Sequence, residues 1–144
     1  MPALSQSFPF TVNSTSTITV NYPNTGTTAL TYISDKLKGD GYFGNSDGFH
    51  SIQLKTSDFI GRVTIEGTLS IEPTSTDWFS VNLDSTRTYV DTTGLVREES
   101  VPYVNYTTAT TTIVGYNFTG NFVWVRSKIS NFTQGTVVFV KYNN

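Results

Sequence analysis

The segment 61–72 alternates between apolar and polar residues almost without exception. Its polar side carries charged and hydroxyl residues, and its apolar side carries Val63, Ile65, Gly67, Leu69 and Ile71. Successive side chains of a strand point to opposite faces of a sheet, so this period of two predicts a half-buried β-strand. Gly67 in mid-strand predicts a bulge or a close aromatic contact, with Trp78 across the next turn as candidate partner. Trp78-Phe79 opens the following strand, and alternation places one of these two aromatic side chains in the core.

Other runs of strand length recur along the whole chain. Clusters of Gly, Asn, Asp and Pro separate them, and no segment shows a sustained helical period with caps. The predicted strands are 7–12, 16–22, 29–34, 49–55, 61–72, 78–83, 86–91, 110–116, 121–130 and 136–142. Many short strands at near-regular spacing favour one antiparallel β-sandwich of about eight to ten strands with little or no helix, of which a jelly-roll is one form. The length of 144 residues fits a single domain over 1–144.

Composition supports the strand prediction and narrows the partners. Charged residues are 14% of the chain, against roughly 25% in typical soluble domains, and Thr, Tyr and Phe are abundant. A net charge of −2 is too small to attract nucleic acid or an anionic membrane, so neither is an expected partner. The chain has no cysteine for disulfides or thiolate metal sites. Residues 1–14 lack the basic and apolar segments of a signal peptide, so we expect synthesis in a cytoplasm.

The titratable residues do not form a recognisable catalytic pattern. His50 is the single histidine, and Asp47 and Ser51 are its neighbours only in sequence, which does not make a catalytic triad. Glu66 and Glu72 would lie roughly 20 Å apart along a strand, beyond the roughly 5–9.5 Å of a glycosidase carboxylate pair. No glycine-rich phosphate loop follows a strand. We therefore expect neither an enzyme nor a bound cofactor.

Two irregular segments, 35–48 and 92–109, are expected to be long loops that carry contacts. Asp40 and Asp47 in the first suggest oxygen ligation of calcium, but their spacing does not match an EF-hand. Turn formation is the preferred explanation, and no metal site is expected. Aromatic side chains in the two loops could stack on sugar rings, or could pin the loops to the ends of the sandwich. These candidate loop contacts are Tyr42, Phe43, Tyr103 and Tyr106.

The last two predicted strands, 121–130 and 136–142, are partly apolar on both faces. Either a loop of the same chain covers their outer face, or that face is a subunit interface rich in the Trp and Arg typical of hot spots. The candidate interface residues are Phe122, Trp124, Arg126, Lys128 and Phe139. If the two strands pair as a hairpin, the three aromatic residues share one face, and we expect a cyclic homo-oligomer with a trimer slightly favoured. The segments 1–12 and 136–144 are candidates for strand addition between subunits.

Two segments are similar to a known group of proteins. Residues 59–83, FIGRVTIEGTLSIEPTSTDWFSVNL, contain a Gly-x-Val-x-Ile-x-Gly-Thr-Leu strand that leads through a polar loop to a Trp-Phe pair. Residues 117–144 contain a Trp-Val-Arg strand, a glycine turn and a final strand. Together they resemble small virion structural proteins of tailed phages, most closely those of marine T4-like cyanophages. The resemblance is confined to these two segments and includes no reactive residues.

This resemblance implies a virion protein without enzymatic activity: a capsid decoration, neck or tail accessory protein that contacts other virion proteins. It places the protein in a virion that is assembled in the host cytoplasm. The loop aromatics keep a second hypothesis open. In that alternative the chain is a carbohydrate-binding module that contributes to host-surface attachment through a glycan.

Overall fold

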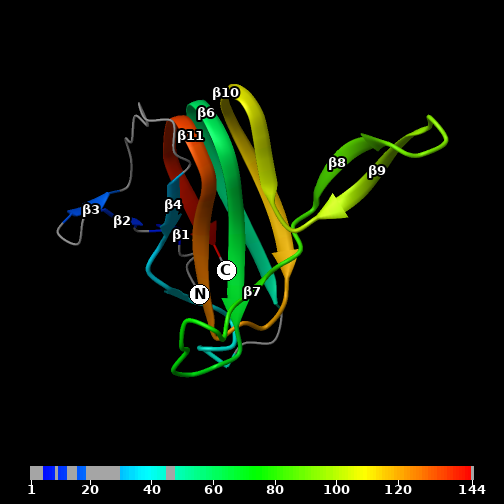
Figure 1. Cartoon of the computed structure of the whole chain (residues 1–144). Helices are drawn as coiled ribbons and strands as arrows, with labels where there is room; N and C mark the ends of the chain where they lie inside the picture. Colours follow the sequence, from blue (N-terminus) through cyan, green and yellow to red (C-terminus); the bar gives the residue numbers. More distant parts are fainter. Residues whose placement is uncertain (1–4, 9, 13–15, 19–29, 45–47, 144) are drawn as a thin grey trace.

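All regular elements that the structure describes are β-strands (Figure 1). The computed structural model describes residues 5–8, 10–12, 16–18, 30–44 and 48–143. The strands are β1 (Ser5–Ser7), β2 (Phe10–Val12), β3 (Ser16–Ile18), β4 (Leu30–Ile33), β5 (Leu37–Lys38), β6 (Phe49–Thr68), β7 (Phe79–Ser80), β8 (Ser85–Val90), β9 (Val96–Val101), β10 (Val104–Thr119) and β11 (Trp124–Asn143). Every pairing among them is antiparallel, which confirms the predicted all-β class. Over the same residues, no helix has the length and apolarity that crossing a membrane requires.

Three long strands, β6, β10 and β11, form most of the main sheet. β10 and β11 pair with opposite edges of β6, in the order β1-β11-β6-β10, while β4 and β5 pair with β11 and β7 pairs with β6. β2 and β3 form a separate two-stranded sheet, and so do β8 and β9. The β8–β9 hairpin projects from the rest of the molecule (Figure 1). We call this hairpin, residues 85–101, the arm, and the bent main sheet the body.

Each long strand bends sharply near its middle, so that its two halves lie over one another (Figure 1). The pairing of β6 with β11 shifts register between Ser130 and Gln134, and that of β6 with β10 shifts after Tyr106. Bulges of this kind bend a strand. At the bend φ is 50° at Asp58 and 79° at Gly135, and a Cβ on Gly135 would lie 2.1 Å from the Asp58 carbonyl oxygen. Only glycine fits there, and the bent sheet supplies the two facing layers of a sandwich.

The bend corrects the predicted strand boundaries. Segments 49–55 and 61–72 belong to the two halves of β6, and 121–130 and 136–142 belong to the two halves of β11. The last two therefore do not pair as a hairpin, because both pair with β6. The residues between them, 131–135, begin and end with positive φ but keep the strand continuous. A turn and a bulge both interrupt a period of two with residues that tolerate positive φ, so the sequence pattern does not separate them.

The observed pairing changes two further expectations. The segment 92–109, expected to be a loop, is mostly β9 and the first residues of β10. Of the segment 136–144, residues 136–143 pair with β6 along one edge, and β1 pairs with residues 141–143 along the other, so the end of β11 is not a free edge for strand addition. Of the segment 1–12, β1 is already paired with β11, and residues 1–4 and 9 lie outside the described part.

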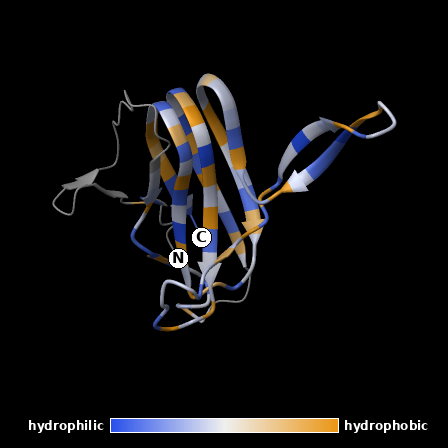
Figure 2. Ribbon diagram, viewed as in Figure 1, coloured by the Kyte–Doolittle hydropathy of each residue, from blue (hydrophilic) through white to orange (hydrophobic). Residues whose placement is uncertain are grey.

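The core lies between the two layers. Apolar and polar residues alternate along the long strands (Figure 2), which turns one apolar set inward. The fully buried apolar side chains include Leu54, Phe59, Val63, Ile65, Val125, Phe132 and Val140. At the bend, Phe59 and Phe132 pack edge to face with ring centroids 5.2 Å apart. The apolar side of 61–72 is buried only as far as β6 extends, and beyond it Leu69 and Ile71 are 65% and 77% exposed.

Gly67 is in close contact with an aromatic ring, as predicted, but the ring is that of Phe122 rather than Trp78. A Cβ on Gly67 would lie 2.7 Å from the Phe122 ring. Trp78 and Phe79 both stay outside the core. Trp78 is half-buried, with the guanidinium of Arg126 4.2 Å from its ring centroid, and Phe79 contacts Phe122 with ring centroids 5.7 Å apart. Because β7 has only two residues, the alternation expected of a longer strand does not bury either ring.

Candidate functional site

The candidate interface residues do not form one exposed face. Phe122 is buried in the core, where it contacts Gly67 and lies 5.8 Å from the ring centroid of His50. Trp124 and Phe139 lie on the two halves of the single bent strand β11, and not on two neighbouring strands of a hairpin. Phe122 is thus a core residue, and the prediction of three aromatic side chains on one interface is wrong.

Trp124 is covered by the chain itself. Its ring centroid lies 5.0 Å from that of Tyr42, the Lys36 ammonium lies 4.7 Å from the centroid, and its indole N–H donates to the Ile71 carbonyl oxygen at 2.9 Å. Phe43 packs edge-on against Tyr42, with ring centroids 5.4 Å apart. One of the four candidate loop contacts, Tyr42, therefore packs on a tryptophan of the sheet, and a second, Phe43, packs on Tyr42. This is the alternative in which a loop of the same chain covers the outer face.

Arg126 and Lys128 occupy half-buried positions on the same half of β11. The Nε of Arg126 lies 2.9 Å from a carboxylate oxygen of Glu66 on β6, and both side chains are mostly buried. Lys128 is opposite Thr64 of β6 and Ile33 of β4 in the pairing register. Arg126 is thus engaged within the sheet rather than placed at the rim of an interface.

His50 is a packed core residue. Its Nε2 lies 2.5 Å from the carbonyl oxygen of Gly120, which can only accept, so Nε2 is the donor. Its Nδ1 shares a hydrogen bond of 2.7 Å with the Tyr142 hydroxyl. Ser51 donates instead to Asn117 at 2.7 Å. Both ring nitrogens have partners that are not those of a catalytic triad.

Asp40 closes its own loop, and Asp47 lies outside the described residues. The Asp40 carboxylate is buried and accepts a hydrogen bond from the backbone N–H of Gly48 at 3.0 Å, a turn-stabilising role. Within the described ranges, no three His, Cys, Asp or Glu side chains are grouped so as to hold a metal ion.

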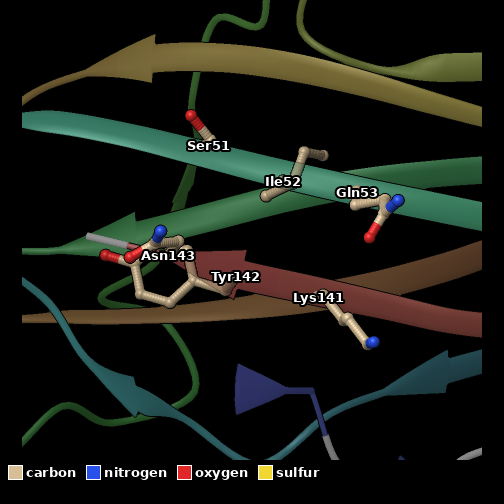
Figure 3. A pocket seen from close by; sticks show the side chains of 6 residues that line it. All are labelled: Ser51, Ile52, Gln53, Lys141, Tyr142 and Asn143. Atoms are coloured by element: carbon tan, nitrogen blue, oxygen red, sulfur yellow. The ribbon is translucent and has the colours of Figure 1, made fainter. Parts of the chain in front are cut away.

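A cavity of about 200 Å³ lies over the paired ends of β6 and β11 (Figure 3). Its polar side chains face each other across the ladder, Ser51 opposite Asn143 and Gln53 opposite Lys141. The Oδ1 atom of Asn143 is buried without a hydrogen-bond partner. The Lys141 ammonium lies 4.5 Å from the ring centroid of Phe139. The groups that line this cavity come from two neighbouring strands. They include one charged side chain, Lys141, and one aromatic side chain, Tyr142, and so do not surround a ligand-sized space with several such groups.

A second cavity of about 280 Å³ lies where the arm joins the body. Side chains of β6, β8 and β10 line it, together with the turn between β9 and β10. We call it the Tyr-Arg cleft after its principal side chains, Arg62, Arg87, Tyr103, Asn105, Tyr106 and Tyr116. Val101 and Val104 contribute apolar surface, and Ser85 and Thr86 contribute hydroxyl groups. Two of the four candidate loop contacts, both tyrosines, thus meet here.

Arg62 is held in the cleft by neighbours that carry no negative charge. Its guanidinium carbon lies 3.9 Å from the ring centroid of Tyr103, and its Nε donates to the side-chain oxygen of Asn105 at 3.4 Å. Arg62 and Asn105 are directly opposite in the β6–β10 ladder, so the sheet itself brings them together. Among the described residues no carboxylate pairs with Arg62. Its charge is therefore not neutralised within the cleft.

The other titratable groups of the cleft have partners. Arg87 pairs with Glu99 across the arm, and this contact raises the pKa of its guanidinium. Burial, together with the neighbouring Tyr116, raises the pKa of Tyr106 to about 12. The phenol of Tyr106 is therefore uncharged at neutral pH and can both donate and accept a hydrogen bond.

Sequence reasoning found Tyr103 and Tyr106 but missed Arg62, Arg87 and Tyr116. The available signal was weak, because both arginines lie on predicted strands and exposed arginines on strands are common. What brings these residues together is the pairing of β10 beside β6 and the position of the arm next to that pair. No local pattern encodes such a long-range arrangement.

Comparison with known proteins does not supply a relative. No family model, no curated protein and no solved structure matches the chain. The function has therefore to be inferred from the residues and contacts of the molecule itself.

Proposed function

We propose that this protein is a non-enzymatic structural component of a tailed-phage virion, a capsid decoration, neck or tail accessory protein that acts through protein–protein contacts. The resemblance of residues 59–83 and 117–144 to small virion proteins motivates the proposal. The observation that carries it is the arm, an ordered hairpin that projects from the body and ends in exposed apolar side chains.

The tip of the arm exposes three aliphatic side chains. Figure 2 shows a hydrophobic region near this end of the arm. Val90, Leu95 and Val96 are 66%, 58% and 71% exposed, and Val90 is opposite Val96 in the β8–β9 pairing. Fully burying a Val or Leu side chain gives roughly 1.5–3 kcal/mol. Three such side chains on a projecting element therefore favour contact with another protein surface.

Polar contacts, rather than a core of its own, hold the arm in shape. The Asp91 carboxylate accepts hydrogen bonds from the backbone N–H groups of Thr93 at 2.8 Å and Leu95 at 3.0 Å, and it pairs with Arg97. A second ion pair spans the two strands. An isolated two-stranded hairpin is marginally stable in water, and these contacts offset that weakness. An arm that is already ordered loses less entropy when it docks.

The arm is also the surface that we propose for contacts between copies of the chain. A cyclic homo-oligomer, with a trimer slightly favoured, is the assembly expected of a component repeated around a symmetry axis. Other virion proteins are the remaining partners of the proposal. The arm takes the place of the aromatic face that the sequence predicted, since Phe122 is buried in the core.

Antibody labelling of intact particles tests virion residence and location together. We expect an antibody raised against the chain to detect it in purified tailed-phage particles and to label their surface. If the protein is absent from purified particles, the proposal is wrong.

A variant of the tip tests the role of the arm. The triple variant Val90→Ser, Leu95→Ser and Val96→Ser should keep its far-UV circular dichroism spectrum but should be lost from particles. The matched control is Ile113→Ser, which changes an exposed aliphatic residue of β10 and should be incorporated normally. Normal incorporation of the triple variant would show that the arm is not the docking element.

A further inference from the structure

The Tyr-Arg cleft provides a ligand site that a purely structural role does not use. We propose that it binds one carboxylated sugar, a uronic-acid residue of an acidic glycan, with Arg62 holding the carboxylate. This inference goes beyond the proposed structural function and does not depend on it.

The charge of the cleft matches a single carboxylate. Arg87 is neutralised by Glu99, whereas Arg62 pairs with no carboxylate of the described chain. The protein as a whole carries −2, so an arginine without an acidic partner is not explained by a general excess of positive charge. The planar guanidinium presents paired N–H donors, which fit the two oxygens of a carboxylate.

Arg62 is oriented before any ligand arrives. Its guanidinium lies against the ring of Tyr103, and its Nε is engaged by Asn105. The N–H groups of its two terminal nitrogens are left for a ligand, because a guanidinium has five donors and Nε supplies only one. A side chain that is already held in place loses little rotamer entropy on binding.

The remainder of the lining fits a ring with several hydroxyl groups. Tyr103, Tyr106 and Tyr116 bring phenol hydroxyls and flat apolar rings, and Asn105 brings a side-chain amide. These neutral groups can donate and accept hydrogen bonds with sugar hydroxyls, while the aromatic rings pack against the C–H faces of a sugar. A free phosphate or an acidic peptide side chain would engage Arg62 and leave most of these groups unused. The lining therefore favours a sugar among the possible anions.

The volume of the cleft sets the size of the ligand. At about 280 Å³ it is just below the roughly 300–1,000 Å³ typical of pockets for drug-sized ligands. One sugar ring is therefore the unit that we expect to be enclosed, with any further residues of the glycan outside the cleft.

Calorimetric titration of the full chain with methyl glucuronide, and with methyl glucoside as the neutral control of the same ring, tests the inference. We expect saturable binding of the glucuronide at one site per chain. The affinity for the glucoside should be lower by a factor of at least about ten, which is the factor that the loss of one hydrogen bond to a charged group gives. Equal affinity for the two sugars, or no binding of either, would overturn the proposal.

Two variants of basic residues on β6 locate the site. Arg62→Gln should remove the preference for the glucuronide. Lys55→Gln, which changes a cation of β6 that does not line the cleft, should keep that preference, and its loss would count against the assignment. The comparison of the two sugars on the unaltered protein decides the question even if Arg62→Gln does not fold by circular dichroism.

Competition with other anions separates a sugar site from a general anion site. Inorganic phosphate and N-acetylglutamate methylamide should displace the glucuronide only at concentrations about tenfold higher or more, because neither matches the neutral groups of the lining. Displacement by either at equal concentration would show that the cleft recognises charge alone, and the sugar assignment would be wrong.

Discussion

The body and the arm are both antiparallel β-structure, but different forces hold them together. In the body, three long strands bend around a core whose largest side chains, such as Phe59 and Phe132, are fully buried. In the arm, β8 and β9 pair with each other, and nearly all of their residues are exposed or half-exposed. Apolar burial therefore stabilises the body, whereas ion pairs and the hydrogen bonds that Asp91 accepts in the turn stabilise the arm.

This difference separates two tasks within one chain. Apolar burial is not weakened by the screening of charges, so the body is suited to act as a rigid scaffold. Exposed ion pairs are screened by salt and contribute little to global stability, so the arm can be altered without unfolding the body. The Tyr-Arg cleft lies at the junction and takes residues from both regions, which makes its geometry dependent on each.

Removing a ring from the bend should have the largest effect on the body. Phe59 is fully buried and packs against Phe132 at 5.2 Å and Tyr106 at 6.2 Å between ring centroids. Phe59→Ala should lower the free energy of unfolding by about 3–5 kcal/mol, measured by urea denaturation, because it removes the ring and leaves a cavity. Phe49→Ala is the control at the first residue of β6, where the side chain is 70% exposed, and it should change the stability far less. Equal losses for the two variants would mean that the bend does not organise the core.

Two glycines with positive φ should behave differently in the two regions. Gly135 in the bend has φ of 79° and no room for a Cβ beside Asp58, whereas Gly94 in the arm has φ of 86° and no atom within 4 Å of a Cβ. The left-handed conformation alone costs alanine roughly 1–2 kcal/mol, and Gly135→Ala adds a backbone clash. We expect Gly135→Ala to lower the thermal midpoint of the body clearly, and Gly94→Ala to leave it almost unchanged. A body equally destabilised by both changes would show that arm and body unfold as one unit.

The bend also explains how far the sequence determines the fold. The alternation at Val63 and Ile65 correctly predicts buried strand positions, because period two is a local property of the backbone. Continuity of β11 through Asn131 and Gly135 was not predictable, since positive φ is compatible with a turn as well as with a bulge. Pairing with β6 decides between them, and that pairing is a long-range property.

The candidate sites follow the same division. Tyr103 and Tyr106 were found because aromatic residues near turn signals are conspicuous in a sequence. Tyr42 looks equivalent by that criterion, yet it covers Trp124 instead of opening to a ligand. Arg62 gains its importance only from the register that sets it opposite Asn105 and from the absence of an acidic partner in the described chain. Such a role depends on tertiary structure, which residue type alone does not reveal.

The smallest expected effect is confined to the arm and depends on pH. Hydrogen bonds from the Thr93 hydroxyl and from Arg97 hold the pKa of Asp91 well below its usual value, and the Thr93 hydroxyl contributes most. Since the pKa is lower in the folded arm than in the unfolded chain, the carboxylate stabilises the turn fully above about pH 4, the range of an ordinary aspartate. This stabilisation is lost as the pH falls through the lowered pKa. Hydrogen-exchange protection factors at the amides of Thr93 and Leu95 should therefore fall on acidification before those of β6 do.

Asp91→Ala supplies the control for this pH dependence, because it removes the carboxylate at every pH. Its Thr93 and Leu95 amides should be poorly protected already at neutral pH, since both donate to the Asp91 side chain in the folded arm. The amides of β6 should keep the protection of the unaltered protein, because the body does not use these contacts. If Asp91→Ala and the unaltered chain show equal protection at the arm tip at neutral pH, the carboxylate does not hold the turn. The stabilisation of the arm by polar contacts would then have to come from the pair between Arg87 and Glu99.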